Sequence, residues 1–365
     1  MSRLIAKGLR ASRVRFLICV GGIAVSTMLV VILLAAYRSV VGGVSGFLGR
    51  RGLDLWIAPR GTDNLIRSSG LIATSTLDEI RALPGVARVD PILRAFVAAE
   101  ANGNRLTLLG IGFRAPDGLG GPPLVSGRAP EHSNEVALDR AAAHRLGVAV
   151  GDSLLLNGHR KIVVGLTGGT NLLATQFVFG SVESSSTPLP VVSFGIVALA
   201  PGAVSSEVAR RMHKRFPDLE IMDRDVFIQN NVREIGSGFL PMLLLITLLG
   251  VTSASLLVAF LMEGVVEERR GELAVLLAAG ATPAAIASGL TLHAAKLLGT
   301  GIAAGAIAAH LLSWLIDVIA PVIPLTYSAA DLLLVAALLS ASGLFASVVP
   351  VLRLKDIDPL EAFRS

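Results

Sequence analysis

The sequence predicts an α-helical membrane protein with four transmembrane helices and a mixed α/β extracytoplasmic domain. The chain has 365 residues, of which 53% are hydrophobic and only 16% charged, and its mean hydropathy is +0.69. Soluble domains carry about 25% charged residues. Four uncharged stretches are each long enough for a helix to cross a hydrocarbon core of about 30 Å. A segment of ordinary polarity, 40–234, separates the first stretch from the second.

The four uncharged stretches lie between charged residues. They are 16–37, 235–262, 297–316 and 332–352. The predicted transmembrane helices are 16–39, 235–262, 290–319 and 331–352. A further uncharged stretch, Leu273 to Leu292, is interrupted by Gly280-Ala281-Thr282-Pro283, a helix stop followed by an N-cap Thr and an N1 Pro. We expect two short helices at the membrane surface here, the second continuing into the third span. A separate membrane segment is the alternative.

Basic residues in the short flanks predict the orientation of the chain. The segment before the first span is basic with no acid, and the segment after the last span contains Arg353, Lys355 and Arg364. Because basic flanks stay in the cytoplasm, both termini are predicted to be cytoplasmic. Segments 263–289 and 353–365 then lie inside, and 40–234 and the short loop 320–330 lie outside. The first span is too long for a cleavable signal peptide and is expected to remain as an anchor.

The outer segment 40–234 is predicted to be a ferredoxin-like (split βαβ), porter-like layer with a small all-β insertion. Leu53 to Ile57 alternates as a half-buried strand does, and Thr76 to Glu79 has the pattern of a capping box at a helix start. Strands are expected at Val86–Ala99 and Arg105–Gly110, with a turn at Asn102-Gly103. A strand–helix–strand set follows at 191–222. The insertion is placed at about 117–183, with an Asn157-Gly158 hairpin as its strongest signal.

Several chemistries are excluded or lack support. The chain has five lysines, and none stands in the Gly-Lys-Ser/Thr pattern of a phosphate-binding loop. The six histidines show no metal spacing, and no Gly-x-Ser-x-Gly elbow is present. The lone Cys19 cannot form an intramolecular disulfide. The excess of 27 Arg over five Lys beside apolar stretches indicates topology rather than nucleic-acid binding. No catalytic residue or metal site is predicted.

Small residues in the third span predict close helix packing. Gly301, Gly305 and Ala309 follow one another at four-residue spacing, which lets helix backbones approach in lipid. In a chain so rich in Ala and Gly, chance spacing is the alternative.

The most informative stretch follows the second span. From Glu263 to Thr282 the sequence predicts a charged helical extension, a turn at Gly280 and a short helix that returns to the membrane. A solvated loop between spans is the plainer alternative. The ordered pattern of two acids, two basic residues, a further acid, an apolar helix and Gly-Ala is more than a loop requires.

Here the sequence resembles the permease subunits of ABC systems of the MacB/FtsX/LolC-E (type VII) kind. Their motif after the second span is matched by Glu268, Arg269, Glu272, Leu273, Gly280 and Ala281. The basic segment 1–15 is similar to their amphipathic cytoplasmic elbow. Segments that resemble family patterns are 80–91, Gly127-Arg128, 146–152 and 358–364. Leu53 to Pro59 and the compact length are nearest the DevC-like permeases. His293 departs from the pattern, since the family has an acid there.

The resemblance implies a transport subunit rather than an enzyme. A separate ATPase would hold ATP and Mg, and its hydrolysis would drive movements of the outer domain that export or extract a lipid, peptide or drug-like substrate, a mechanism called mechanotransmission. The expected coupling residues are Glu267, Glu268, Arg269, Arg270, Glu272, Leu273, Gly280, Ala281, Thr282 and Pro283.

The expected partners are the ATPase, a second permease copy (homodimer or related heterodimer), the lipid membrane and, as a further candidate, a periplasmic adaptor. No nucleic acid is expected. The expected location is the bacterial cytoplasmic membrane. Two alternatives stay open: an FtsX-like regulator that activates a cell-wall hydrolase without transport, and a membrane sensor or binding protein outside the ABC class.

Overall fold

The computed structural model describes residues 2–50, 52–66, 70–115, 117–171, 175–182, 190–319, 325 and 327–352. The chain divides into two compact units. The helical unit comprises Met1–Ala36, Leu240–Ile316 and Leu325–Ser365. The α/β unit comprises Tyr37–Phe239 and Asp317–Pro324. The predicted tail 353–365 lies outside the described residues.

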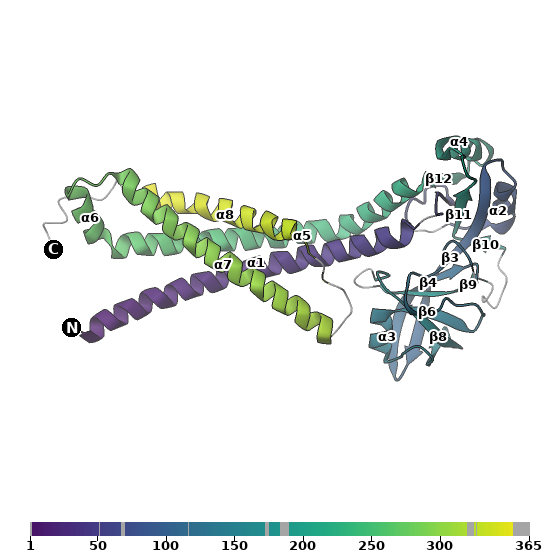
Figure 1. The fold of residues 1–365 in the computed structure, drawn as a ribbon, viewed down its shortest axis with the longest axis horizontal. Coiled ribbons are helices and arrows are strands. Elements are labelled where there is room, and N and C mark those ends of the chain that lie inside the picture. The colour runs from purple at the N-terminus through teal and green to yellow at the C-terminus, as the bar shows by residue number, and fades with distance from the viewer. Residues whose placement is uncertain are drawn as a thin grey trace. The chain divides into compact units, whose positions relative to one another are not determined.

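Long helices dominate the helical unit (Figure 1). They are α1 (Ser2–Leu48), α5 (Arg224–Glu268), α6 (Arg270–Ala278), α7 (Pro283–Ile319) and α8 (Ala329–Leu352). All except α6 are long and apolar enough to cross a membrane. Each predicted span lies within one of these four helices. α1 has no break between residues 2–15 and the first predicted span.

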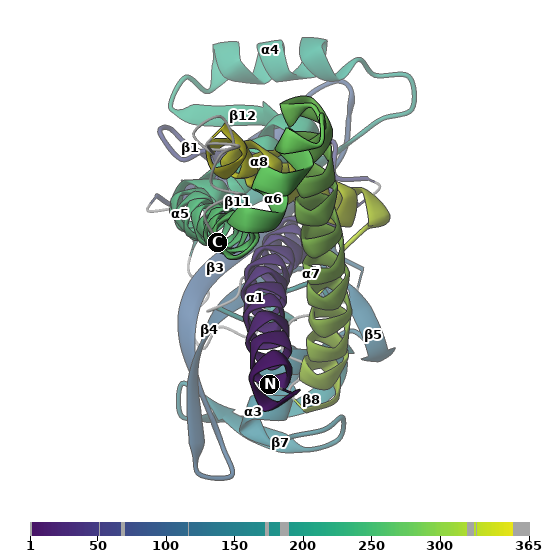
Figure 2. The same ribbon diagram turned by 90° about the vertical axis from the view of Figure 1, so that its left-hand side faces the viewer.

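The helices of this unit pack around one apolar core to which α1, α5, α7 and α8 all contribute. Its fully buried members include Ile23, Val258, Leu297 and Leu339. Figure 2 looks along the long helices from the end that carries α6. The packing faces are narrow stripes, because many large apolar side chains on the same helices remain exposed. Such exposed apolar faces suit contact with lipid.

Two glycines allow α7 to approach α1 closely. A Cβ atom at Gly301 would lie 2.7 Å from the Cβ of Ile23. A Cβ at Gly305 would lie 2.5 Å from the carbonyl oxygen of Ala24. Ala309, one turn further, is fully buried. The three small residues therefore lie where α7 contacts its neighbours within the same chain.

A capping box that the sequence reading missed begins α8. The Ser328 backbone N–H donates to the Asp331 carboxylate at 2.8 Å, and the Asp331 N–H reaches the Ser328 hydroxyl at 3.3 Å. Such reciprocal bonds satisfy backbone donors that a helix start leaves open.

The α/β unit contains one large sheet and a separate two-stranded sheet, β10-β2. The main sheet has the order β12-β1-β11-β3-β4-β9-β6-β8-β5, with β7 beside β3 and β8. The strands are β1 (Leu55–Pro59), β2 (Ile72–Ala73), β3 (Val86–Ala101), β4 (Asn104–Phe113), β5 (Leu124–Gly127), β6 (Glu135–Asp139), β7 (Ser153–Leu156), β8 (His159–Thr167), β9 (Phe177–Ser181), β10 (Val191–Val192), β11 (Phe194–Leu199) and β12 (Leu219–Asp223). The helices of this unit are α2 (Thr74–Arg81), α3 (Arg140–Leu146) and α4 (Ser205–Arg215).

The two Asn-Gly turns were predicted correctly. Asn102 and Gly103 join β3 to β4 with φ values of 49° and 77°, and Asn157 and Gly158 join β7 to β8 with φ values of 48° and 82°. Two successive positive φ values are typical of the type I′ turn, whose twist suits a two-residue hairpin.

β1 lies between two apolar layers. Leu55 and Ile57 face a cluster that includes residues of α2 and α4, whereas Trp56 belongs to a second cluster with Phe194 and Phe227. Phe227 stacks on Trp56 with ring centroids 4.3 Å apart. The strand was predicted, but its half-burial was wrong, because helical residues cover both faces of β1.

Two further expectations for this unit were wrong. The capping box at Thr76 to Glu79 does not begin a helix, since α2 starts at Thr74 after Ala73 and has no side-chain cap. Segment 117–183 is not an all-β insertion, since it contains α3, whose N-cap Asp139 accepts a hydrogen bond from the Ala141 N–H. Nor does it form a separate layer: β9 pairs with β4 and β7 pairs with β3 in the main sheet.

Candidate functional site

Two helices, α5 and α6, end sharply in the region that follows the second predicted span. α5 ends at Glu268, and Arg269 leaves helical geometry with φ −107° and ψ 16°. α6 ends in a Schellman motif, in which the Gly280 N–H donates to the Leu277 carbonyl at 3.0 Å and the Ala281 N–H to the Leu276 carbonyl at 2.9 Å. Gly280 has φ +96°, which an L side chain rarely adopts.

The start of α7 follows at once. Pro283 is its first residue, and the Thr282 hydroxyl accepts from the Ala285 N–H at 3.3 Å. Pro has no N–H to leave unpaired at this position, so both residues suit a helix start. The structure thus contains the two helices expected between Leu273 and Leu292, and the second continues into the apolar part of α7.

A small apolar core holds α6 against α5 and α7. Its buried members are Val266 from α5, Leu273 and Ala274 from α6, and Leu290 from α7. Ala274 is fully buried, which leaves no space for a larger side chain between the helices. The opposite face of α6 is exposed and includes Val275 and Leu276, which are about half exposed.

Charged residues surround this core. Arg15 of α1 forms an ion pair with Glu268 at the end of α5. Arg269 lies 3.9 Å from Glu272, and both side chains are mostly exposed, at 67% and 75%. Because exposed pairs at this distance contribute little, Arg269 and Glu272 remain available to a partner. Arg15 was used in the sequence reading only for orientation, and no local signal pairs it with a residue 253 positions away.

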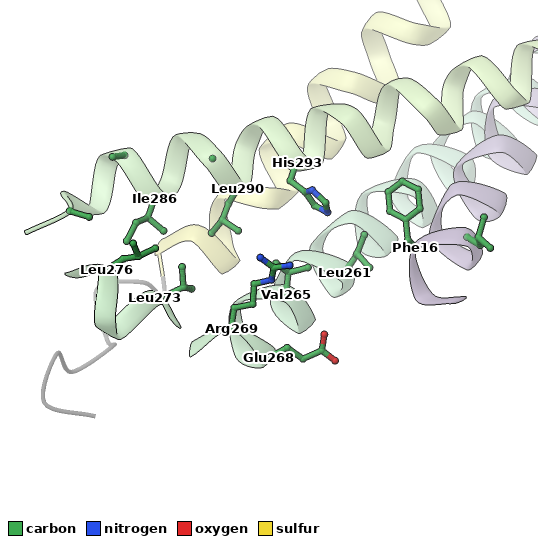
Figure 3. Close-up of a pocket in the computed structure, with 14 residues that line it drawn as sticks. Phe16, Leu261, Val265, Glu268, Arg269, Leu273, Leu276, Ile286, Leu290 and His293 are labelled. Atoms are coloured by element: carbon green, nitrogen blue, oxygen red, sulfur yellow. The ribbon is translucent and has the colours of Figure 1, made fainter. Parts of the chain in front are cut away.

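A cavity of about 840 Å³ lies within the helical unit beside this segment (Figure 3). Most of its wall is apolar. It is lined by Phe16, Leu17, Leu261, Val265, Glu268, Arg269, Leu273, Leu276, Ala281, Ala285, Ile286, Gly289, Leu290 and His293. Figure 3 shows Arg269, between α5 and α6, and His293, on α7, bordering the same space.

The structure brings part of the predicted coupling set together. Glu268, Arg269, Leu273 and Ala281 all border the cavity. The other predicted residues are placed around them: Glu267 is exposed on the last turn of α5, Arg270 and Glu272 are in the first turn of α6, and Gly280, Thr282 and Pro283 form the turn into α7. The apolar residues from α1, α5 and α7 that complete the wall were missed, because their proximity depends on how distant helices pack.

His293 lies where the family pattern has an acid. Its ring is tilted against that of Phe16, with centroids 6.4 Å apart. At this position the side chain therefore contacts Phe16 of α1 through its ring.

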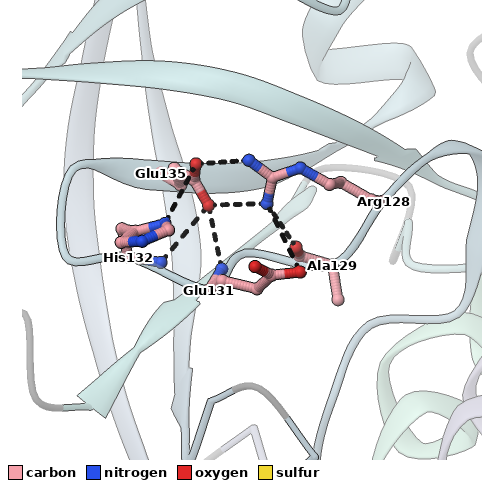
Figure 4. Close-up of polar contacts among 5 residues, drawn as sticks. All are labelled: Arg128, Ala129, Glu131, His132 and Glu135. Carbon is pink, nitrogen blue, oxygen red and sulfur yellow. Dashed lines mark hydrogen bonds and ion pairs between the residues drawn. The ribbon is translucent and has the colours of Figure 1, made fainter.

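A second polar cluster lies in the α/β unit around the buried Glu135 (Figure 4). Its carboxylate accepts from the Arg128 guanidinium at 2.8 Å and from the backbone N–H groups of Glu131 and His132 at 2.9 and 3.2 Å. The hydrogen bonds from Arg128, helped by the two N–H groups, lower the pKa of Glu135 from 4.5 to about 2. These contacts hold the loop before β6 against Arg128. Because the Glu135 carboxylate has its hydrogen-bond partners within the cluster, we interpret the cluster as structural.

Among the described residues, no group of three or more His, Cys, Asp or Glu side chains could hold a metal ion. Elsewhere in the α/β unit, burial raises the pKa of Asp139, which caps α3 and accepts from the Thr170 hydroxyl at 2.7 Å.

Helices of membrane-spanning length joined to an α/β unit define a membrane protein with an appended globular domain, and comparison with known proteins identifies the kind. A model of the MacB-like periplasmic core domain matches residues 16–215. A model of the FtsX-like permease C-terminal matches residues 230–359. The chain is a bacterial ABC transporter permease and belongs to the MacB/FtsX-like family.

Individual relatives are more distant. Rv0072 of Mycobacterium tuberculosis, an uncharacterized ABC transporter permease, is 27% identical over 322 residues, which cover 86% of this chain and 84% of that protein. The periplasmic region of MacB from Actinobacillus actinomycetemcomitans aligns with 48% of this chain and 91% of that structure, at 15% identity and a TM-score of 0.38. The extracellular domain of YknZ from Gram-positive bacteria aligns with 47% of this chain and 98% of that structure, at 13% identity and a TM-score of 0.35.

Proposed function

We propose that this chain couples ATP hydrolysis in a separate ATPase subunit to movements of its α/β unit, and thereby exports or extracts a lipid, peptide or drug-like substrate. One observation carries the proposal. α5 is a single helix from Arg224 to Glu268: Phe227 near its start is buried in the α/β unit, and its last turn leads into α6. Pro241 inside α5 removes one backbone hydrogen bond, but the helix continues on both sides of it. We therefore expect displacement at one end of α5 to move the other.

The exposed face of α6 and its flanks would receive the ATPase. This surface combines exposed acids, exposed Arg269 and the half-exposed apolar pair Val275 and Leu276. Such a mixed surface suits a specific interface, with apolar contacts at its centre and charges at its rim. ATP and Mg would be held by the partner. A second permease copy would complete the assembly, with a periplasmic adaptor as a further candidate.

The proposed location is the bacterial cytoplasmic membrane, with α1, α5, α7 and α8 as spans and both termini in the cytoplasm. The basic residues before the first span and after the last span support this orientation. The α/β unit would then lie outside the membrane.

We also propose a ferredoxin-like layer in the α/β unit. In the strand order β12-β1-β11-β3, each strand is antiparallel to its neighbour. Helix α2 lies in the connection between β1 and β3, and α4 connects β11 to β12. This order and pairing support a split βαβ arrangement.

The test is purification of the full-length chain from its native membrane with any ATPase that accompanies it, followed by vanadate-sensitive ATP hydrolysis. Glu272→Lys, at an exposed position on α6, is expected to lower stimulation of the ATPase at least several-fold while the chain still accumulates normally. Asp117→Lys makes the same charge change on the exposed surface of the α/β unit and should leave stimulation intact.

Three results would count against the proposal. Unchanged stimulation in Glu272→Lys would contradict the coupling surface. A chain that purifies without an ATPase, even after gentle crosslinking, would favour a sensor or binding protein. An ATPase complex that copurifies with a cell-wall hydrolase and moves no substrate would favour the regulator.

A further inference from the structure

We propose that the cavity of about 840 Å³ between α1, α5, α6 and α7 is a binding site for one glycerophospholipid. An acyl chain would occupy its apolar end, and the phosphate would contact Arg269. The inference rests on the proposed function in two respects: the leaflet, which would be the cytoplasmic one, and the regulatory role of the lipid.

The apolar end of the cavity lies at the depth where lipid tails begin. Phe16 and Leu17 stand at the start of the first predicted span, Leu261 at the end of the second and Leu290 at the start of the third. These residues come from three different helices, yet all lie at the same edge of the apolar stretches. A cavity wall at this depth borders lipid chains, which are apolar ligands present at high concentration.

The other end of the cavity is charged in a way that suits a phosphate. Among the described residues of the cavity wall, Glu268 is the only acid, and Arg15 pairs with it. Arg269 is 67% exposed, and its nearest acid, Glu272, lies 3.9 Å away, beyond hydrogen-bond distance. An arginine guanidinium binds phosphate oxygens through paired donors. Cationic pockets between transmembrane helices on the cytoplasmic side are typical lipid headgroup sites.

The size and the floor of the cavity fit an amphiphile rather than a polar metabolite. Ligand pockets typically measure about 300–1,000 Å³, and most of this wall offers no hydrogen-bonding side chain. Gly289 leaves the wall on α7 open, since a Cβ atom there would meet no other atom within 4 Å. A polar solute would lose its hydration in such a space without compensation, whereas an acyl chain would not.

A lipid in this cavity would regulate the proposed coupling. Leu273 and Leu276 of α6 border the cavity, and the half-exposed Leu276 also belongs to the surface of α6 proposed to receive the ATPase. The lipid would therefore support the helix proposed to receive the ATPase, and its loss would let that helix shift.

The experiment measures phospholipid bound to the full-length chain by native mass spectrometry after extraction in a mild detergent. Phosphatidylglycerol and phosphatidylethanolamine, each with palmitoyl and oleoyl chains, are added separately. Gly289→Trp fills the cavity. Gly299→Trp is the matched control, because Gly299 is also an exposed glycine of α7 with nothing within 4 Å of its Cβ site, but it does not line the cavity.

We expect about one tightly bound phospholipid per chain, at least tenfold weaker binding in Gly289→Trp, and unchanged binding in Gly299→Trp. Arg269→Gln should weaken binding severalfold through loss of the phosphate contact. Stronger binding of phosphatidylglycerol would identify an anionic headgroup, and equal binding of the two lipids would identify the phosphate and acyl chain as the recognised parts.

Equal phospholipid binding in the two tryptophan variants would overturn the proposal. The proposal would also be overturned by a chain that binds no added phospholipid but whose cavity residues become less accessible to solvent when an ATPase is present. The ATPase would then be the occupant of the cavity. If the chain binds the lipid but never copurifies with an ATPase, the lipid site is supported and the proposed function is refuted. The two failures are therefore distinguishable.

Discussion

The contact between α1 and α7 gives a quantitative prediction for Gly305→Ala. The added methyl group would lie 2.5 Å from both the Ala24 carbonyl oxygen and the Thr27 Cβ, and neither atom can move away by a side-chain rotation alone. The helices must therefore separate. Overpacking of this kind costs about 1–3 kcal/mol. Replacing Gly by Ala inside a helix regains up to about 1 kcal/mol of helix propensity.

Gly299→Ala separates the two effects, because its methyl group would meet no atom within 4 Å. It should be neutral or more stable than the parent chain, so that the two variants differ by about 2 kcal/mol. The assay is unfolding of the full-length chain in mixed micelles, followed as the denaturing detergent fraction rises. If Gly305→Ala unfolds at the same detergent fraction as Gly299→Ala, the close contact of α7 with α1 is refuted.

Three further predictions concern charges and a helix end. Since folding lowers the pKa of Glu135 from 4.5 to about 2, its stabilising effect is present above pH 4.5 and lost as the pH falls toward 2. Glu135→Gln should cost on the order of 1–2 kcal/mol at pH 7 and remove that dependence, measured by hydrogen exchange of β6 and β8 in the full-length chain; unchanged exchange would contradict it. Glu268→Arg should weaken the contact of α1 with α5, and adding Arg15→Glu to the same chain should restore it. Crosslinking between cysteines placed in α1 and α5 measures both effects. If the second change does not restore crosslinking, Glu268 acts elsewhere. Gly280→Ala should cost about 1 kcal/mol at φ +96°, seen as faster exchange at the end of α6; unchanged exchange there would argue against the left-handed turn.

Local chemistry could be read from the sequence where a few neighbouring residues decide the structure. Both Asn-Gly turns and the Gly280 to Pro283 break were predicted, because a positive φ, a missing N–H or a hydroxyl cap acts within four residues. The same kind of signal also misled. Thr76 to Glu79 has a capping-box pattern, yet α2 starts earlier, at Thr74.

The candidate site was only half predictable. The charged and turn residues after α5 stand together in the sequence, so their pattern was visible. The partners Arg15, Phe16 and Leu290 come from α1 and α7, and only helix packing brings them to the same cavity. Glu135 was missed entirely, because nothing in the sequence distinguishes it from an ordinary exposed acid.

Composition and local pattern by themselves determined the class of this protein: apolar stretches of membrane length, the polar segment between the first two, and the turn residues that end α6 and start α7. Each of these depends on hydrophobicity or on backbone preference over a short stretch. Only the tertiary structure decided that segment 117–183 joins the main sheet, that β1 is covered on both faces, and that α1, α5, α6 and α7 border one cavity. Those features depend on pairing and packing between residues far apart in the chain, and such contacts leave no periodic signal in a single sequence.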